Sequence, residues 1–299
     1  MKHFLYSTGL TALLVLPMLG CTGPHSLEQA DTTADLNLPR ETPGGPAQLL
    51  SAFFGLDNKM PQRSNSICRD AVGLDGMPVI FSTEIDHTTL QAGDFLVTKK
   101  SGAKGHVHCV TLVPATDAGE LRTVLLIGEF GNAEADAPAR VDVTGHIHAI
   151  DRSLDFKGAA VMVTPLEQGP SLILAERFDL THPYKGLDVR RTRGDNCPAK
   201  DTLQAVRVVW AGGVTLANGK EPGAAERDLY RVTVQAQDGT LRVVAPTALA
   251  DLGDGDNNHL LCLSTTDRPV SVAFPAGIFT DPNGDLNPAT SVKLTSRNQ

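Results

Sequence analysis

The sequence predicts an all-β protein of two sandwich-like domains, and three observations support this. Apolar and polar residues alternate in many short runs, as they do in strands with one buried face. Gly, Asp, Asn and Pro separate these runs at the spacing of turns. Helical patterns are scarce, since only PTALADL fits one or two helical turns. Short strands at this spacing favour sandwiches or barrels over alternating β-α units.

The expected strands fall into two groups, which we assign to domains 48–168 and 169–299, with LEQGPS near the junction. The start, 48–56, fits a helical turn or a strand equally well. The first domain then contains the runs MPVIFST, DFLVTKK, HCVTLVP, LRTVLLIGEF, ARVDVTGHI and AAVMVTPL. The second contains LQAVRVVWAG, DLYRVTVQA, GTLRVVAP, HLLCLST and VSVAFPAG. Because the chain has only three Tyr and one Trp, aliphatic side chains must fill both cores.

Residues 1–20 have the pattern of a secretory signal peptide. One Lys precedes a short apolar run that Pro17 interrupts, and this run is too short to span a membrane. The tetrapeptide MLGC that follows resembles the lipobox of bacterial lipoproteins. That resemblance implies that Cys21 carries a lipid, and Thr22 after it is compatible with the outer membrane. Met18 stands where Leu is more usual, so cleavage without lipidation stays an alternative.

Residues 21–47 are polar, rich in Pro and Gly and without periodicity, so we expect a flexible tether between the lipid and the folded body. No later stretch is apolar enough to span a membrane. The net charge of −8 excludes a nucleic-acid partner, because such a protein needs a basic surface to neutralise phosphates. The expected partners are the membrane, through the lipid, and an envelope protein or glycan.

Four cysteines remain beyond Cys21, namely Cys68, Cys109, Cys197 and Cys262. An even number in an exported protein indicates two disulfides, for which three connectivities exist. The simplest pairs Cys68 with Cys109 and Cys197 with Cys262, because each bond then lies within one domain. Their spacing fits neither a zinc site nor a thiol-exchange motif.

The stretch VIFSTEIDHTTLQAGDFLV, from Val79 to Val97, resembles the start of bacterial Ig-like domains of the SbsA type. The matching residues are Phe81, Ser82, Ile85, Asp86, Thr89, Leu90 and Phe95. RSLDFKG, at 152–158, stands where that family has a D-x-x-G-N loop, although the Asn is missing. The resemblance covers at most residues 75–165. It implies an Ig-like sandwich in a structural or adhesive surface module and brings no catalytic residues.

Two His-x-His pairs, His106 with His108 and His146 with His148, are the first candidate for chemistry. Residues two apart share one face of a strand, so two neighbouring strands could offer four nitrogen ligands to Zn or Cu. Alternation in ARVDVTGHIHAI, however, places the second pair on the polar face. Two sets of exposed histidines are therefore the alternative interpretation.

Two loops rich in Asp and Asn are the second candidate, and calcium is the one cofactor that the sequence suggests. LGDGDNNH spans 252–259, and TDPNGDLNP contains Asp281, Asn283, Asp285 and Asn287 in alternation. Hard cations need several oxygens from one tight loop. The second loop fails the EF-hand pattern, because Leu286 stands where Gly is required. An Asx-rich turn is the alternative.

Hydrolase motifs are absent from the sequence, including the G-x-S-x-G elbow and H-E-x-x-H. Dispersed carboxylates could still form a glycosidase pair. The acidic residues nearest strand ends are Glu84, Asp86, Asp94 and Glu129.

We therefore expect a non-enzymatic, lipid-anchored envelope protein that displays a binding surface for a protein or glycan. The rival functions are a periplasmic Cu/Zn protein that uses the His-x-His pairs and a hydrolase with dispersed carboxylates.

Overall fold

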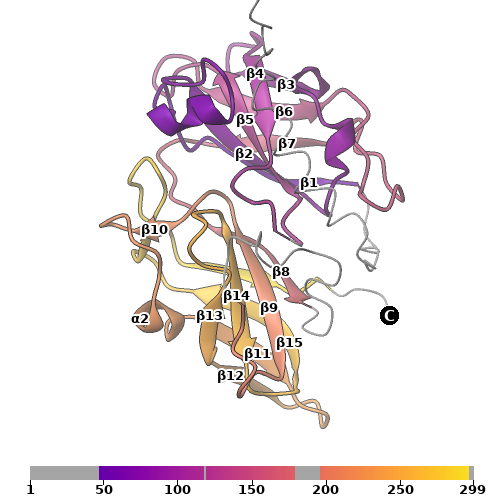
Figure 1. Cartoon of the computed structure of the whole chain (residues 1–299), viewed down its shortest axis with the longest axis vertical. Helices are drawn as coiled ribbons and strands as arrows, with labels where there is room; N and C mark the ends of the chain where they lie inside the picture. The colour runs from indigo at the N-terminus through magenta and orange to yellow at the C-terminus, as the bar shows by residue number, and fades with distance from the viewer. Residues whose placement is uncertain (1–46, 118, 179–195, 296–299) are drawn as a thin grey trace, which may run out of the picture.

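The computed structural model of the chain describes residues 47–117, 119–178 and 196–295, in which nearly every regular element is a strand (Figure 1). The all-β prediction is confirmed. The predicted signal peptide, Cys21 and nearly all of the predicted tether lie outside the described residues. Within the described ranges, no helix is long and apolar enough to cross a membrane.

The first half of the molecule is one seven-stranded sheet in the order β3-β6-β7-β1-β2-β5-β4. Its strands are β1 (Leu49–Phe53), β2 (Asp75–Phe81), β3 (Phe95–Lys99), β4 (His106–Thr111), β5 (Thr123–Glu129), β6 (Pro138–Val143) and β7 (Ala160–Thr164). Three short 3-10 helices accompany them: η1 (Gln62–Ser66), η2 (His87–Thr89) and η3 (Ala92–Asp94). All pairings are antiparallel except that of β1 with β7.

This sheet curls until its two end strands meet. The turn between β3 and β4 joins the two ends: Thr98 and Lys104 form an antiparallel bridge, and the amide of Gly105 donates to the carbonyl of Val97 at 2.9 Å. The sequence predicts two facing sheets here. Either arrangement buries one face of each strand, so the alternation of apolar residues is the same for both.

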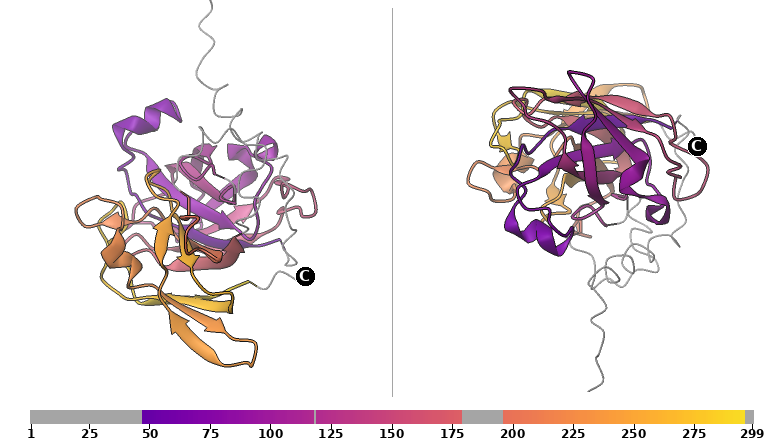
Figure 2. Two further views of the ribbon diagram at one scale, coloured as in Figure 1. Left: turned by 60° about the horizontal axis from the view of Figure 1, so that its bottom comes forward. Right: turned by 90° about the horizontal axis from the view of Figure 1, so that it is seen from above.

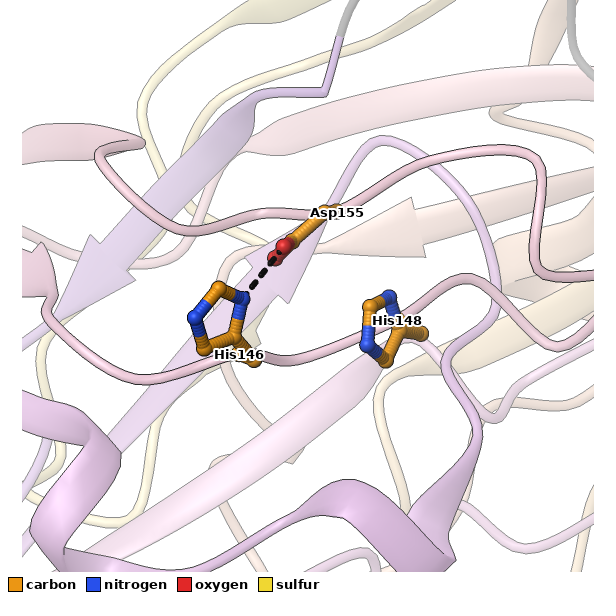
Figure 3. Close-up of side chains that lie close together, drawn as sticks. All are labelled: His146, His148 and Asp155. Atoms are coloured by element: carbon orange, nitrogen blue, oxygen red, sulfur yellow. Dashed lines mark hydrogen bonds and ion pairs between the residues drawn. The ribbon is translucent and has the colours of Figure 1, made fainter.

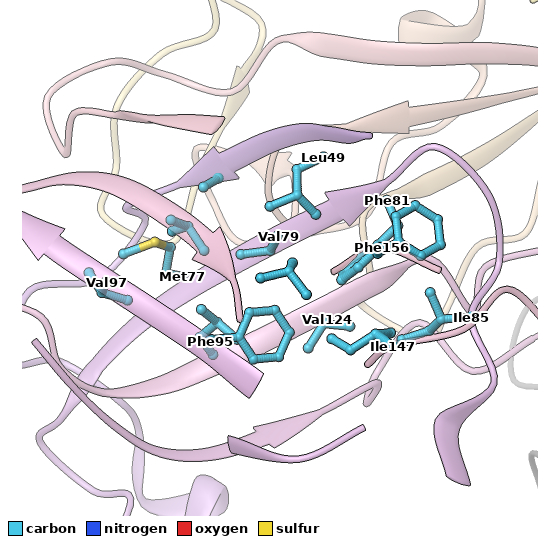
Figure 4. Close-up of a cluster of buried hydrophobic side chains, with 14 of the residues drawn as sticks. Leu49, Met77, Val79, Phe81, Ile85, Phe95, Val97, Val124, Ile147 and Phe156 are labelled. Carbon is cyan, nitrogen blue, oxygen red and sulfur yellow. The ribbon is translucent and has the colours of Figure 1, made fainter. Parts of the chain in front are cut away.

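The core of the first half lies inside the curled sheet (Figure 4). Phe81 packs edge to face against Phe95 and Phe156, with ring centroids 6.3 and 4.9 Å apart. Asp86 begins η2 by accepting the amide of Thr88 at 2.9 Å, as expected for a tight turn after β2. The segment with the Ig-like resemblance therefore supplies both a turn and inward-facing aromatic rings.

The second half consists of two four-stranded sheets, β13-β14-β9-β8 and β12-β11-β15-β17, and a small pair, β10-β16. The strands are β8 (Leu172–Phe178), β9 (Gln204–Trp210), β10 (Thr215–Leu216), β11 (Arg231–Gln235), β12 (Leu241–Val244), β13 (Ala248–Ala250), β14 (Asn258–Leu263), β15 (Arg268–Phe274), β16 (Phe279–Thr280) and β17 (Thr290–Lys293). One short helix, α2 (Ala224–Arg227), lies between β10 and β11. Trp210 packs against Phe274 and Phe279 at the centre of this sandwich.

The two halves pack against each other through the outer face of β8 and β9. Val206, Val208 and Trp210 point into the sandwich core, so the alternate residues of β9 point out of it. Val209 there contacts Leu174 and Ile80, and Ile80 belongs to β2 of the first half. Seen from above, the purple first half lies in front of the orange and yellow second half (Figure 2). The predicted domain boundary at 168–169 stays a prediction, and it falls between β7 and β8.

Each half contains one disulfide. Cys68 is bonded to Cys109, and Cys197 is bonded to Cys262. This is the simplest of the three connectivities. Two disulfides are typical of an exported or cell-surface protein.

Candidate functional site

Five carboxylates from the two halves converge in a buried cluster, which we call the acidic centre. They are Asp117, Glu120, Asp251, Asp254 and Asp256. Ligand atoms of Asp117, Asp251 and Asp254 lie within 4.8 Å of one another, and so do those of Glu120, Asp254 and Asp256. Asp254 belongs to both sets, so the two sets adjoin. All five are buried except Asp254, which is half-buried.

The second half contributes to the acidic centre through the β13–β14 loop. Gly253 and Gly255 take positive φ angles of 96° and 74°, which L side chains rarely adopt, and they allow the tight turn. Asp256 accepts hydrogen bonds from the backbone and side-chain amides of Asn258, both at 2.7 Å. The side chain of Asn257 donates to the carbonyl of Trp210 at 2.7 Å and so fastens the loop to β9.

The first half contributes through the β4–β5 connection. Oε2 of Glu120 accepts the amide of Asp117 at 2.9 Å, which leaves Oε1 for other partners. The amide of Gly119 donates to Oε1 of Glu84 at 2.8 Å, so this connection is tied to the segment after β2. These bonds fix Asp117 and Glu120 at the boundary between the two halves.

One guanidinium, that of Arg207, faces the acidic centre from the outer face of β9. Its Nη2 lies 3.4 Å from Oδ2 of Asp251 and 3.9 Å from Oε1 of Glu120. Burial lowers the pKa of Arg207, but the charges of Asp251 and Glu120 outweigh burial and raise it overall. The side chain is 0% exposed, so Arg207 stays charged inside the protein.

Gly119 makes the close approach of Arg207 possible. A Cβ atom at this position would lie 1.6 Å from Nη1 of Arg207, and the φ angle of Gly119 is +90°. Phe178 covers the guanidinium from another side, with its ring centroid 4.6 Å from Cζ. The guanidinium is therefore enclosed between the two halves.

A second buried ion pair joins the halves next to the acidic centre. Nη2 of Arg122, in the first half, lies 2.8 Å from Oε1 of Glu176 on β8, and their side chains are 3% and 7% exposed. Arg122 also donates to the carbonyl of Gly119 at 3.3 Å. The charge of Glu176 also contributes to the raised pKa of Arg207, so this pair adjoins the acidic centre.

Negative charge exceeds positive charge in the acidic centre. Burial, then the charges of Asp251 and Asp256, raises the pKa of Glu120 well above its usual range. Burial, then the charges of Asp254 and Asp251, does the same to Asp256. Burial and the charge of Asp251 raise the pKa of Asp254 to about 7. Among the described residues, the carboxylates of the acidic centre therefore carry more charge than Arg207 compensates.

Several oxygens of this cluster accept no hydrogen bond from the described residues, although they are buried. They are Oε1 of Glu120, Oδ1 of Asp251, Oδ2 of Asp254 and Oδ1 of the adjacent Asn258. Glu120, Asp251 and Asn258 are at most 1% exposed. Buried oxygens without donors are costly, and oxygens of this kind are the ligands that hard cations prefer.

A cavity of about 570 Å³ lies beside the acidic centre, between the two halves. Aliphatic side chains, prolines and glycines form most of its wall, with Lys59 and Arg63 on the first-half side and Asp254 and Asp256 on the second-half side. The hydroxyl of Thr123 is buried in this wall and has no hydrogen-bond partner among the described residues. The cavity is large enough for a small molecule or a few residues of a peptide.

The structure separates the two His-x-His pairs. His106 and His108 are exposed on β4, where the ring of His108 bonds to the carbonyl of Arg69 at 2.7 Å. His146 and His148 lie after β6, with rings stacked at 6.2 Å (Figure 3). In the described part of the chain, His106 and His108 share no three-ligand group with the second pair.

His146 and His148 form a possible three-ligand group with Asp155, within 4.8 Å. Nδ1 of His146 is already bonded to Asp155 at 2.6 Å, and Nζ of Lys157 lies 3.0 Å from its Nε2. A lysine ammonium at this distance opposes a second cation. Zn or Cu at the histidines stays a prediction, and the site is weaker than the acidic centre.

The predicted calcium loop at Asp281 is an Asx-type turn. Oδ1 of Asp281 accepts the amides of Asn283 and Asp285 at 3.0 and 2.8 Å. Asn287 uses both side-chain atoms on backbone groups, for example with Oδ1 accepting the amide of Phe279 at 2.8 Å. Calcium at these four residues stays a prediction, although much of their bonding capacity is used within the loop.

The four carboxylates considered for a hydrolase do not come together as a pair. Glu84 bonds Gly119, Asp86 begins η2, Asp94 caps η3, and Glu129 is exposed at the end of β5. Only Glu84 reaches the neighbourhood of the acidic centre. The others have local structural roles.

Sequence reasoning found the loop at 252–259 but missed Asp251 just before it, as well as Asp117, Glu120 and Arg207. Arg207 stands at a polar position of an alternating strand, which normally indicates a solvent-facing residue. The signal that could have found it is the valines on both sides of it, VRVV, since a strand with two covered faces reads as a continuous apolar run.

No protein-family model matches the chain, and no curated protein matches it. Three solved structures of S-layer proteins resemble it weakly. The N-terminal part of the bacterial S-layer protein SbsC has 11% identity and a TM-score of 0.28, over 84% of this chain and 45% of that one. The S-layer protein rSbsC(31-844) has 12% identity and a TM-score of 0.28, over 78% and 42%.

Domains 1–6 of surface layer protein SbsC have 11% identity and a TM-score of 0.28, over 86% of this chain and 41% of that one. The chain spans less than half the length of each of these three proteins.

Proposed function

We propose that this protein is a non-enzymatic, exported binding protein that holds an extended peptide segment of an envelope protein between its two halves. The observation that supports this most is the cavity of about 570 Å³ with its mainly aliphatic wall. Cavities between domains are the usual place for ligand sites. Attachment to the envelope through a lipid on Cys21 is part of the same proposal.

A peptide fits the wall of the cavity better than a glycan does. Sugar rings commonly stack on aromatic side chains, and no described residue that lines the cavity is aromatic. The unpaired hydroxyl of Thr123 can bond a peptide amide or carbonyl. Lys59 and Arg63 are exposed at the wall and suit an acidic residue of the peptide.

One observation favours a hydrolase as the second candidate. Asp254 lines the cavity, and its pKa of about 7 suits a general acid. A glycosidase needs a second carboxylate, however, and Asp256 is committed to Asn258 through both oxygens. We therefore place hydrolysis below peptide binding.

The test is selection of phage-displayed random octapeptides on the purified protein, followed by fluorescence anisotropy on synthetic winners. Leu125→Trp fills the cavity, and Leu241→Trp is the matched control on a residue that is 60% exposed and outside the lining. We expect the selected peptides to be aliphatic with one acidic residue. Leu125→Trp should bind them at least about tenfold more weakly than the wild type, whereas Leu241→Trp should bind them as tightly as the wild type. Equal binding by both variants, or binding of oligosaccharides in place of peptides, would refute the proposal.

A further inference from the structure

We propose that the acidic centre is a calcium site whose ligands come from both halves of the molecule. Asp251, Asp254 and Asp256 come from the β13–β14 loop, and Asp117 and Glu120 come from the β4–β5 connection. This inference does not rest on the proposed peptide binding.

Convergence of the ligand atoms is the first argument. The two sets of three carboxylates, each within 4.8 Å, share Asp254. Each set contains a carboxylate of the first half and two of the second, so a cation bound to either set has ligands from both halves. Ca²⁺ takes six to eight oxygens at about 2.3–2.6 Å, and a cluster of this width and ligand number suits it.

The buried oxygens without donors are the second, independent argument. Oε1 of Glu120 and Oδ1 of Asp251 belong to residues that are 0% and 1% exposed, and no N–H or hydroxyl group of the described residues donates to either. The carboxyl groups of Glu120 and Asp251 can hydrogen-bond each other only when one of them carries a proton. The nearest cation to Oε1 of Glu120 is Arg207, at 3.9 Å, which is beyond hydrogen-bond distance. A bound cation would satisfy these oxygens and compensate the excess negative charge.

The chemistry of the ligands selects among cations. All five side chains offer oxygen, whereas Zn and Cu favour nitrogen or sulfur ligands. Mg²⁺ requires compact octahedral geometry and retains several waters, which a buried site with many protein oxygens does not favour. Calcium is therefore the expected metal.

A calcium ion here couples the two halves. Removing it leaves carboxylates of the first half facing carboxylates of the second half, with Arg207 as the nearest compensating charge. The ion also lies beside the cavity, because Asp254 and Asp256 form part of its wall. Calcium thus fixes the relative position of the walls between which the cavity lies.

The experiment is calorimetric titration of CaCl₂ into the full-length protein after treatment with EGTA. We expect the wild type to bind one calcium ion. Glu120→Gln and Asp254→Asn should each lower the calcium affinity at least about tenfold, and the wild type should bind Mg²⁺ far more weakly than Ca²⁺. Asp285→Asn is the matched control, because it removes one carboxylate from the other Asp-rich loop.

Thermal unfolding keeps the test valid if a variant is impaired in folding. Glu120→Gln removes a buried negative charge, so in EGTA it should be at least as stable as the wild type, whereas in calcium it should be less stable. The proposal would be overturned if calcium binding to the wild type released or absorbed no measurable heat and calcium did not change its melting temperature. Calcium binding that Asp285→Asn abolishes and Glu120→Gln leaves unchanged would overturn it too, by placing the metal in the other loop.

Discussion

The loops at 252–259 and 280–288 have similar composition, and the sequence offers calcium or an Asx-rich turn for each. In the second loop the side chains mostly bond within the loop, since Asp281 and Asn287 accept backbone amides and Asn283 bonds Asp285. One buried oxygen there, Oδ2 of Asp281, has no donor in the described structure. In the first loop, by contrast, oxygens without donors on Asp251 and Asp254 meet Glu120 from the other half.

This difference shows that tertiary packing decides what an Asp-rich loop can do. A short loop satisfies its own carboxylates when it folds back on its backbone. It becomes a cation site when a second segment brings in carboxylates that the loop cannot satisfy. The local pattern is nearly the same in both cases.

The largest expected effect comes from removing the buried guanidinium of the acidic centre. Arg207→Met should lower the free energy of unfolding by about 3–5 kcal/mol in EGTA, because it leaves carboxylates buried without a counter-charge. Urea denaturation measures this. Arg268→Met, at an exposed site, is the control and should change it by less than about 0.5 kcal/mol. Equal effects would mean that Arg207 does not compensate the acidic centre.

A smaller effect is expected where the β4–β5 connection meets Arg207. Gly119→Ala should cost about 3 kcal/mol, because the methyl group must displace the guanidinium and the φ angle of +90° disfavours Ala. Gly253→Ala has a similar φ of +96° but open space around it, so it should cost only about 1–2 kcal/mol. Chemical denaturation of both variants separates the effect of the contact with Arg207 from that of backbone strain. Equal losses of unfolding free energy in the two variants would contradict a contribution from the contact.

Asn287→Ala, in the loop that contains Asp281, should lower the stability of the protein by the same amount with and without calcium. This change removes four hydrogen bonds to backbone groups at a residue that is 2% exposed, so we expect a loss of about 2 kcal/mol. Thermal unfolding in calcium and in EGTA measures it. A loss confined to calcium would show that Asn287 is a ligand.

The smallest expected effect is the dependence of stability on pH, measured in EGTA. Asp254 faces Asp251, Asp117 and Glu221, and its pKa is raised to about 7, above the value of about 3.9 in the unfolded chain. The folded state therefore binds this proton more tightly, and the stability it provides is lost as the pH rises through 7. Denaturation midpoints should be lower at pH 8 than at pH 5.

Calcium should remove this trend, and Asp254→Asn should flatten it. The lowered pKa values of Asp136 and Asp155 act in the opposite sense only in more acidic solution. Burial lowers the pKa of His259 to about 4, so this residue adds stability as the pH rises towards 6.5, and the comparison with Asp254→Asn isolates Asp254. An equal change in midpoint from pH 5 to pH 8 in the wild type and in Asp254→Asn would contradict the raised pKa of Asp254.

Much of the fold could be predicted from the sequence because each strand carries its own pattern. Phe81, Ile85 and Phe95 face inward as their spacing predicts, and Asp86 begins the expected turn. Half of the candidate site could not be predicted. Glu120 and Arg207 become site residues only when one half covers the other, and no local pattern encodes that contact.

The most direct test of the interdomain calcium site is the melting temperature of the full-length protein in saturating calcium and in EGTA. At a calcium concentration of 100 Kd, binding adds about 2.7 kcal/mol of stability, which corresponds to a rise of about 5–10 °C. We predict this rise for the wild type. At the same calcium concentration, Glu120→Gln and Asp254→Asn, which lie in different halves, should show at most about half of it, because tenfold weaker binding leaves about 1.4 kcal/mol. Superimposable wild-type curves in calcium and EGTA would contradict the account.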